Sequence, residues 1–339
     1  MSGSSFVTFL ILYVDDILLI ENDTEILKSV KDYLNSKFSM KDLGEAAYIL
    51  GIKIYRDRSR RLIGLSQSTY LDKILKKFSM DGSKKGFLPM LQGTTLSKTQ
   101  SPATAKDREI MDKIPYASAI GSIMYAMLCT RPDVAHAISL TSRYQSDPGL
   151  EHWTAVKNIF KYLRRTKDMF LVYGGEDELV ARCYVDASFD TDPDDSKSQS
   201  GYVFLMNGAA VSWRSSKQTI VAGSSTEAEY VAASEAADEA VWMKEFISGL
   251  GVVPSALDPL VVYCDNNGAI ANAREPRSHK KSKHFKRRFH SIREHVKDGD
   301  IEICKVHTDL NVADPLTKAL PRAKHDQHQK TMGVRFITM

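Results

Sequence analysis

The pattern of apolar and polar residues in the first part of the chain predicts short strands and helices. Two apolar runs flank an acidic pair at residues 15–16, which predicts a β-hairpin with both aspartates at its turn. Apolar residues then recur at helical spacing over residues 23–38. Residues 47–65 predict two strands around a polar turn, and residues 68–78 predict a helix. The opening third therefore mixes both kinds of element.

The middle of the chain has a helical pattern. The segment 93–106 is rich in Ser and Thr and predicts a linker. Apolar residues at helical spacing follow in three stretches, and we expect helices over 116–128, 132–143 and 152–164.

From residue 178 onward the pattern changes to strands that alternate with helices. Residues 178–189 predict a strand, and residues 200–215 predict two strands joined at Asn207-Gly208, a dipeptide typical of tight hairpins. The remaining elements are expected as a long Ala-rich helix over 226–250 that ends at Gly249, a buried strand over 260–267, a strand over 301–307 and a final helix over 312–320. This order predicts a mixed α/β sheet with flanking helices.

Composition narrows the class of protein only slightly. The 339 residues are enough for two or three domains, and a net charge of +4 does not by itself indicate a nucleic-acid partner. The four cysteines are far apart and form no CxxC pair, so we expect reduced thiols rather than a zinc site or disulfides. The most apolar stretch, residues 6–20, contains Asp15 and Asp16, so we expect no membrane span, no secretion and a cytoplasmic or nuclear location.

Four acids occupy suggestive places in the second half. Asp186 lies in a predicted strand, Glu229 lies early in the long helix, Asp265 ends the buried strand, and Asp314 opens the last predicted helix. Each acid alone is commonly a cap or a turn residue. Together they indicate a carboxylate cluster that divalent cations such as Mg²⁺ neutralise, because unpaired charges beside apolar elements are costly.

The sequence around these acids resembles that of one family, the Pol polyproteins of copia-type long-terminal-repeat retrotransposons. The motifs that carry the resemblance are LYVDDILL, MKDLGEAAYILGIKI, LSQSTYLDKIL, YASAIGSIMYAMLCTRPDVAHAIS, HWTAVKNIFKYLRRT, YVDASF, SGYVF with SWRSSKQ, SSTEAEY, YCDNNGAI and NVADPLTK. They cover nearly the whole chain. The resemblance implies an α/β (α+β) fold, with a ribonuclease H-like mixed sheet and flanking helices in the C-terminal half. A truncated reverse transcriptase palm and a mostly helical thumb or connection region would precede it.

The same resemblance implies a division of the chain. We expect the end of the palm and the start of the thumb over 1–92, and the linker with the helical connection over 93–175. The ribonuclease H-like domain would span 176–322, followed by a tail over 323–339.

The resemblance also implies an activity, the metal-dependent hydrolysis of RNA in RNA–DNA hybrids. Asp186, Glu229, Asp265 and Asp314 would be catalytic and would hold two Mg²⁺ ions, with Mn²⁺ as an alternative. Glu229 is chosen over Glu227 because its AEY setting matches the family. His307 would assist product release or position water; the alternative is a strand-end histidine without a role.

Tyr13–Asp16 resembles the polymerase motif of reverse transcriptases, with Asp15 and Asp16 as the remnant of that site. In the family, a further aspartate lies well upstream of this motif, and the sequence begins a short distance before it. We therefore expect that this chain alone does not synthesise DNA.

A basic segment lies between Asp265 and Asp314. Its members proposed to bind nucleic acid are Lys280, Lys281, Lys283, Lys286, Arg287 and Arg288. Concentrated positive charge suits a phosphate backbone. A solvated surface helix and a nuclear-localisation patch remain alternatives for this segment.

For the whole chain, the alternative to a ribonuclease is a non-catalytic nucleic-acid-binding remnant of a degenerate element. The sequence does not indicate an oligomeric state.

Overall fold

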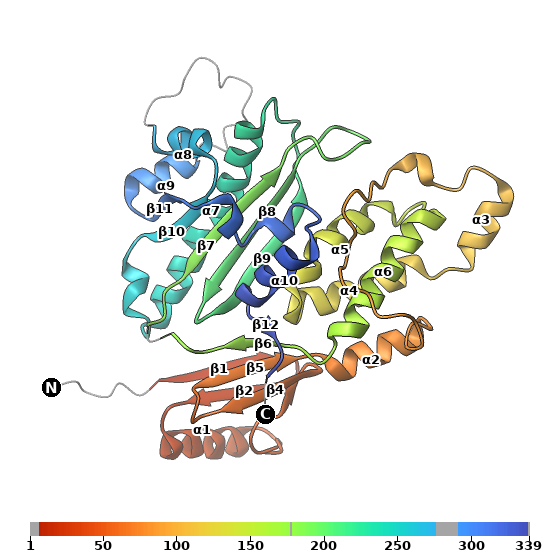
Figure 1. Ribbon diagram of the computed structural model, residues 1–339. Coiled ribbons are helices and arrows are strands. Elements are labelled where there is room, and N and C mark those ends of the chain that lie inside the picture. Colours follow the sequence, from red (N-terminus) through yellow and green to blue (C-terminus); the bar gives the residue numbers. More distant parts are fainter. Residues whose placement is uncertain (1–6, 177, 276–290, 338–339) are drawn as a thin grey trace. The chain divides into compact units, whose positions relative to one another are not determined.

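The computed structural model describes residues 7–176, 178–275 and 291–337. The chain divides into two compact units, Met1–Leu50 and Gly51–Met339. Figure 1 labels most of the helices and strands along the chain. We describe each unit by itself.

The first unit is a hairpin followed by a helix. Strands β1 (Thr8–Tyr13) and β2 (Asp16–Glu21) pair antiparallel, with Tyr13 opposite Asp16, so the predicted hairpin with its acidic turn is confirmed. Helix α1 (Thr24–Lys37) begins where the Asp23 side chain accepts two backbone N–H groups. The unit ends with the short strand β3 (Tyr48–Ile49).

The second unit contains a helical region with its own core. Its helices are α2 (Ser68–Lys77), α3 (Ala105–Asp112), α4 (Tyr116–Thr130), α5 (Ala135–Thr141) and α6 (Leu150–Thr166). The predicted helices here are confirmed. Ile120, Ile123 and Phe160 are fully buried in a common cluster, and Leu96 from the Ser- and Thr-rich segment is buried in it as well. That segment is therefore held against the helices.

A small antiparallel sheet joins the two ends of the second unit. Strands β4 (Ile52–Asp57) and β5 (Leu62–Ser66) pair with each other, and β5 also pairs with β6 (Phe170–Tyr173). On the other side of β6 lies β12 (Val334–Arg335), which follows helix α10 (Arg322–Thr331). The residues expected as a tail thus form a helix and a paired strand, with Met332 buried.

The larger sheet has the order β11-β10-β7-β8-β9. Its strands are β7 (Arg182–Ser188), β8 (Gln199–Met206), β9 (Ala209–Lys217), β10 (Leu260–Cys264) and β11 (Ile301–Lys305). The first three pair antiparallel, whereas β10 is parallel to both β7 and β11. Asn207 and Gly208 both have positive φ at the β8–β9 turn, as the predicted hairpin requires. The expected mixed sheet is confirmed.

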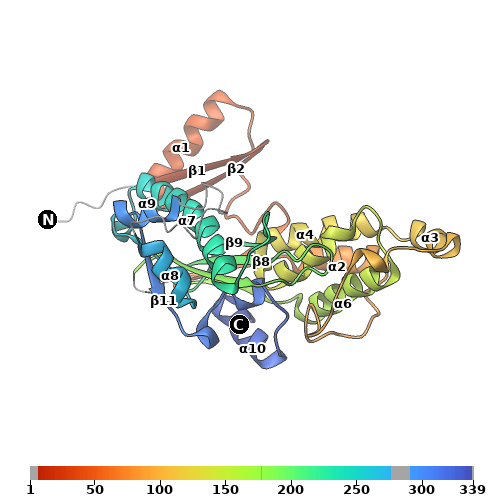
Figure 2. The same cartoon turned by 90° about the horizontal axis from the view of Figure 1, so that it is seen from above.

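Helices cover both faces of this sheet. Helix α7 (Ser225–Leu250) packs across β7, β8 and β10, and its run of buried alanines lets it approach closely. Helices α8 (Asn267–Arg274) and α9 (Ser291–Asp298) lie on the same side, while α10 lies on the other (Figure 2). Helix α7 extends to Leu250, the last residue of the predicted range, and its C-cap is Gly251, with φ of 68°, and not Gly249. Of the described helices, none combines the length and the apolar character that crossing a membrane requires.

The predicted final helix over 312–320 is wrong in extent. Residues 314–316 form only a single 3-10 turn, η8 (Asp314–Leu316), and the last helix is α10. Val312 and Leu316 give the apolar spacing of a helix, but both are buried against the sheet together with β-strand residues. The Thr317 hydroxyl then bonds to a strand residue, so tertiary contacts override the local pattern.

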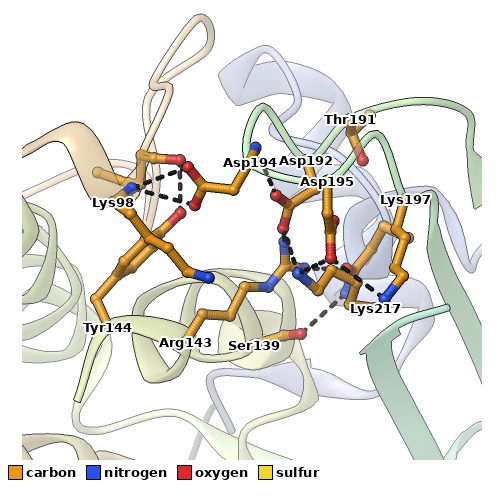
Figure 3. Close-up of polar contacts among 12 residues, drawn as sticks. Lys98, Ser139, Arg143, Tyr144, Thr191, Asp192, Asp194, Asp195, Lys197 and Lys217 are labelled. Carbon is orange, nitrogen blue, oxygen red and sulfur yellow. Dashed lines mark hydrogen bonds and ion pairs between the residues drawn. The ribbon is translucent and has the colours of Figure 1, made fainter. Parts of the chain in front are cut away.

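A polar network connects the helical region to the larger sheet (Figure 3). Arg143, in the 3-10 turn after α5, pairs with Asp192 in the β7–β8 loop, and Lys217 of β9 pairs with the same carboxylate. The side chain of Asp194 accepts from the backbone N–H of Lys98. The loop after β7 is therefore fixed on both sides.

Candidate active site

The structure brings the four predicted acids together at one end of the larger sheet. Carboxylate oxygens of Asp186, Asp265 and Asp314 lie within 4.8 Å of one another, and Glu229 lies within the same limit of Asp265 and Cys264. Asp265 belongs to both groups and so links them.

The sheet register explains the first pair. Strands β7 and β10 are parallel neighbours, with Tyr184 beside Tyr263. Two residues after this pair come Asp186, which is still in β7, and Asp265, which directly follows the end of β10 at Cys264. Asn266 caps α8 and turns the chain away directly after Asp265.

The helix α7 supplies Glu229 from its second turn. Ser224 caps the helix by accepting from the Glu227 N–H, and the Glu227 carboxylate accepts in turn from the Gly223 N–H. Glu227 is thereby committed to the helix start. Glu229 is buried and adds the fourth carboxylate to the cluster. Its catalytic role, for which it was chosen over Glu227, stays a prediction.

Burial and mutual repulsion disturb the ionisation of the cluster. The side chain of Asp186 is 2% exposed, and this burial, with the negative charges of Asp314 and Asp265, raises its pKa to about 6. The Lys318 ammonium and the Thr317 hydroxyl act in the opposite direction on this pKa. Burial and the charges of Asp186 and Asp265 raise the pKa of Glu229 to about 9. Simultaneous ionisation of neighbouring carboxylates is unfavourable where they are buried away from water, because their negative charges repel one another.

Two lysines neutralise part of this charge. Lys318 Nζ lies 3.4 Å from Asp186 Oδ2 and 3.0 Å from Asp314 Oδ1. Lys324 Nζ lies 2.9 Å from Asp314 Oδ2 and 3.2 Å from Asp309 Oδ1. Neither lysine is among the site residues predicted from the sequence, although the spacing of four between Asp314 and Lys318 is typical of an ion pair along a helical segment.

Three further residues hold the segment that carries Asp314. The Asn311 amide donates to the Val185 carbonyl over 2.8 Å, which ties the loop to β7. The Thr317 hydroxyl donates to Asp186 Oδ2. Gly201 of β8 pairs with Asp186, and a Cβ at Gly201 would lie 2.8 Å from Leu316 Cβ. These contacts join residues that are far apart in sequence, so no local pattern indicates them.

His307 lies apart from the acid groups found among the described residues. Its side chain is 72% exposed, it begins the 3-10 turn before Asp314, and its Nδ1 accepts from the Asp309 N–H. Its suggested role in product release stays a prediction. Asp15 and Asp16 lie exposed at the hairpin of the first unit, and their polymerase role also stays a prediction.

The basic segment falls outside the described residues. Lys280, Lys281, Lys283, Lys286, Arg287 and Arg288 all belong to residues 276–290, and their predicted contact with nucleic acid stays a prediction. The four cysteines are free.

The cluster has the donor set of a divalent cation site. Four carboxylates supply hard oxygen ligands, which Mg²⁺ prefers. Within the described part of the chain, Glu229 Oε2 is buried without a hydrogen-bond partner, a costly arrangement that a cation would relieve. Burial and the neighbouring negative charges raise the pKa values of Asp186 and Glu229, so a bound cation would stabilise the ionised form of both carboxylates. The residues therefore fit the predicted cations.

Comparisons with known proteins relate this chain to proteins of retrotransposons. Residues 2–92 match the family model described as reverse transcriptase (RNA-dependent DNA polymerase). The chain is 43% identical over 333 residues to the retrovirus-related Pol polyprotein from transposon TNT 1-94 of Nicotiana tabacum, covering 98% of this chain and 25% of that protein. It is 33% identical over 228 residues to a putative transposon Ty5-1 protein of Saccharomyces cerevisiae, covering 67% of this chain and 72% of that protein.

The chain thus spans about a quarter of the length of the tobacco polyprotein that it matches. Among solved structures, a ribonuclease H1 isolated from compost is similar at 18% identity, with a TM-score of 0.31. That match covers 44% of this chain and 96% of the solved one.

Proposed function

Since the chain belongs to the family of Pol polyproteins of copia-type retrotransposons, we propose that its second unit is a ribonuclease H that cuts the RNA strand of RNA–DNA hybrids. The observation that carries this proposal is the meeting of Asp186, Glu229, Asp265 and Asp314 from four separate elements. Hybrid specificity rests on the family resemblance. Residues 280–288 would contact the phosphate backbone of the substrate.

In this proposal some residues of the site bind cations and others position the ligands. The four carboxylates would hold two divalent cations, which supply the positive charge that activates water and stabilises the leaving oxygen. Asp265 touches both acid groups and would be shared between the two positions. Thr317 fixes the orientation of Asp186 through its hydroxyl, and Asn311 fixes the loop before Asp314. Rigid placement of this kind is what hydrolysis at a phosphodiester requires.

The bond changes follow from the chemistry of the substrate. Water attacks the phosphorus of an RNA phosphodiester, and the bond from phosphorus to the 3′ oxygen breaks. The products carry a 3′-hydroxyl and a 5′-phosphate, as the family resemblance implies. Asp186 and Asp265 must be ionised to hold the cations, so neutralising either one should stop the reaction.

The test is cleavage of a labelled hybrid by the full chain in Mg²⁺ or Mn²⁺, with a chelator as the blank. We expect Asp186→Asn and Asp265→Asn to abolish cleavage while leaving the far-ultraviolet circular dichroism spectrum unchanged. Asp190→Asn is the matched control, because Asp190 is exposed in the loop after β7 and lies outside both acid groups. Cutting by both variants at the wild-type rate contradicts the proposal. Binding of the hybrid without cutting by the wild type would favour a non-catalytic remnant.

A further inference from the structure

We propose that Lys318 is an internal counter-ion of the acid cluster, which a divalent cation displaces on binding, so that this lysine weakens the cation affinity of the site. The inference rests on the proposed function, because it concerns the same four acids. It assigns a role to a residue outside the predicted ligand set.

The position of the ammonium carries the argument. Lys318 Nζ lies 3.0 Å from Asp314 Oδ1 and 3.4 Å from Asp186 Oδ2, which places one positive charge between two carboxylates. Both carboxylates are almost fully buried, with 0% and 2% of the side chains exposed. The Lys318 N–H also bonds to the Asp314 carbonyl over 3.2 Å, so the stem starts from a fixed point.

The same oxygens are the ones that a divalent cation needs. A Mg²⁺ ion binds carboxylate oxygens at about 2.1 Å, closer than any ammonium hydrogen bond allows. A cation on Asp186 and Asp314 would therefore lie within a few ångströms of Lys318 Nζ. Two positive centres at that separation repel strongly where water is excluded. Lys318 must leave, or the cation must bind less tightly.

The side chain of Lys318 is able to leave. It is 37% exposed, so its four-carbon stem already reaches the surface and its charge can move into water without disturbing the core. Lys324 differs, because it pairs with the other carboxylate oxygen of Asp314, Oδ2, and also with the exposed Asp309. Lys318 is thus the lysine that lies between the acids, whereas Lys324 orients one of them.

This arrangement has opposite effects with and without divalent cations. In a chelator, Lys318 compensates two buried negative charges and stabilises the folded chain. In Mg²⁺, the same charge competes with the cation and raises the concentration that half-fills the site. A purely structural lysine would show the first effect and not the second.

The test is titration calorimetry with MgCl₂ on the full chain, with thermal unfolding in a chelator as a second readout. We expect Lys318→Met, which keeps the length and removes the charge, to bind Mg²⁺ about tenfold more tightly than the wild type. The same variant should unfold at a lower temperature in the chelator. Lys318→Arg keeps the charge and should bind Mg²⁺ like the wild type.

The control is Lys330→Met on α10, because this lysine is exposed and lies outside both acid groups; the substitution should change neither readout. Unchanged Mg²⁺ affinity in Lys318→Met, with measurable binding by the wild type, overturns this inference and leaves the proposed function intact. Absence of Mg²⁺ binding in the wild type and in Lys318→Met overturns both.

Discussion

Arg143 donates a hydrogen bond from Nη1 to Oδ2 of Asp192 over 2.6 Å, across 49 positions of sequence. Arg143 belongs to the helical region and Asp192 to the loop between β7 and β8 (Figure 3). The Asp192 carboxylate is only 1% exposed, and Lys217 is its second cation. This ion pair therefore fastens the helical region to the sheet that carries the candidate active site.

Replacing Arg143 by alanine should destabilise the chain by roughly 3 kcal/mol, because removing one partner of a buried ion pair leaves the other charge uncompensated. Lys217 limits the loss by keeping one charge beside Asp192. Urea unfolding measures the change. Arg108→Ala is the control, since Arg108 pairs with Asp147 at the surface and should cost under about 1 kcal/mol. Equal losses of unfolding free energy in the two variants would show that the buried pair stabilises the chain no more than the surface pair does.

A second prediction concerns the expected boundary of the ribonuclease H-like domain. A fragment of residues 176–322 lacks Ala135, Leu171, Met332 and Val334, which are buried in one cluster with Val203 and Leu316. It also lacks Arg143. We expect this fragment to unfold without a cooperative transition, whereas residues 51–339 should unfold in one. Differential scanning calorimetry on both fragments measures this, and a sharp transition in the shorter one contradicts the prediction.

The sequence predicts the elements of the larger sheet because they depend on local patterns. Asn207-Gly208 needs positive φ and so indicates a hairpin wherever it occurs between apolar runs. The acid cluster is predictable for a related reason. Asp186 lies on an apolar strand and Asp265 directly follows one, where a charge without a function would be costly. The motifs that resemble the family link both residues to Glu229 and Asp314.

What the sequence does not predict depends on contacts between distant segments. Val312 and Leu316 have the spacing of a helix, yet they are buried beside the sheet and the chain forms only one 3-10 turn there. The pairing of Arg143 with Asp192 follows from the packing of a helix against a loop, which no spacing encodes. Lys318 combines a predictable and an unpredictable contact. Its spacing of four residues from Asp314 is visible in the sequence, whereas its contact with the distant Asp186 is not.

The ionisation of Glu229 predicts how stability depends on pH in a chelator. Its pKa is raised from 4.5 to about 9 in the folded chain, so the folded state binds the proton more tightly than the unfolded state. The contribution of Glu229 to stability is therefore greatest below the unfolded pKa and falls as pH rises from about 4.5 toward 9. Glu229→Gln removes this loss. Its advantage over the wild type should grow by at least about 1.4 kcal/mol between roughly pH 5 and 8, since one unit of pKa corresponds to that energy.

Urea unfolding at several pH values measures this difference, and Mg²⁺ provides the control. Bound cations favour the ionised carboxylates, so in Mg²⁺ the wild type should lose less stability with rising pH, and the advantage of Glu229→Gln should shrink. A constant difference in stability between the variant and the wild type across this pH range would show that folding does not raise the pKa of Glu229.

Gly201 gives the last prediction, because the absence of its side chain makes room for the segment that carries Asp314. A Cβ there would lie 2.8 Å from both Leu316 Cβ and Thr317 Cγ2, closer than real contacts allow. Gly201→Ala should push this segment away from Asp186, lower stability by roughly 2 kcal/mol and reduce cleavage and Mg²⁺ affinity together.

Gly121→Ala is the matched control for that substitution, since a Cβ at this exposed position of α4 meets nothing within 4 Å. Alanine is the better helix former, so this variant should gain about 0.5–1 kcal/mol and cleave normally. Stability comes from urea unfolding and activity from the hybrid assay. If Gly201→Ala cleaves like Gly121→Ala, then the close approach of η8 to β8 does not set the position of Asp314. The distance between Asp186 and Asp314 would then depend on Asn311, Thr317 and Lys318, which contact β7 and the acids directly.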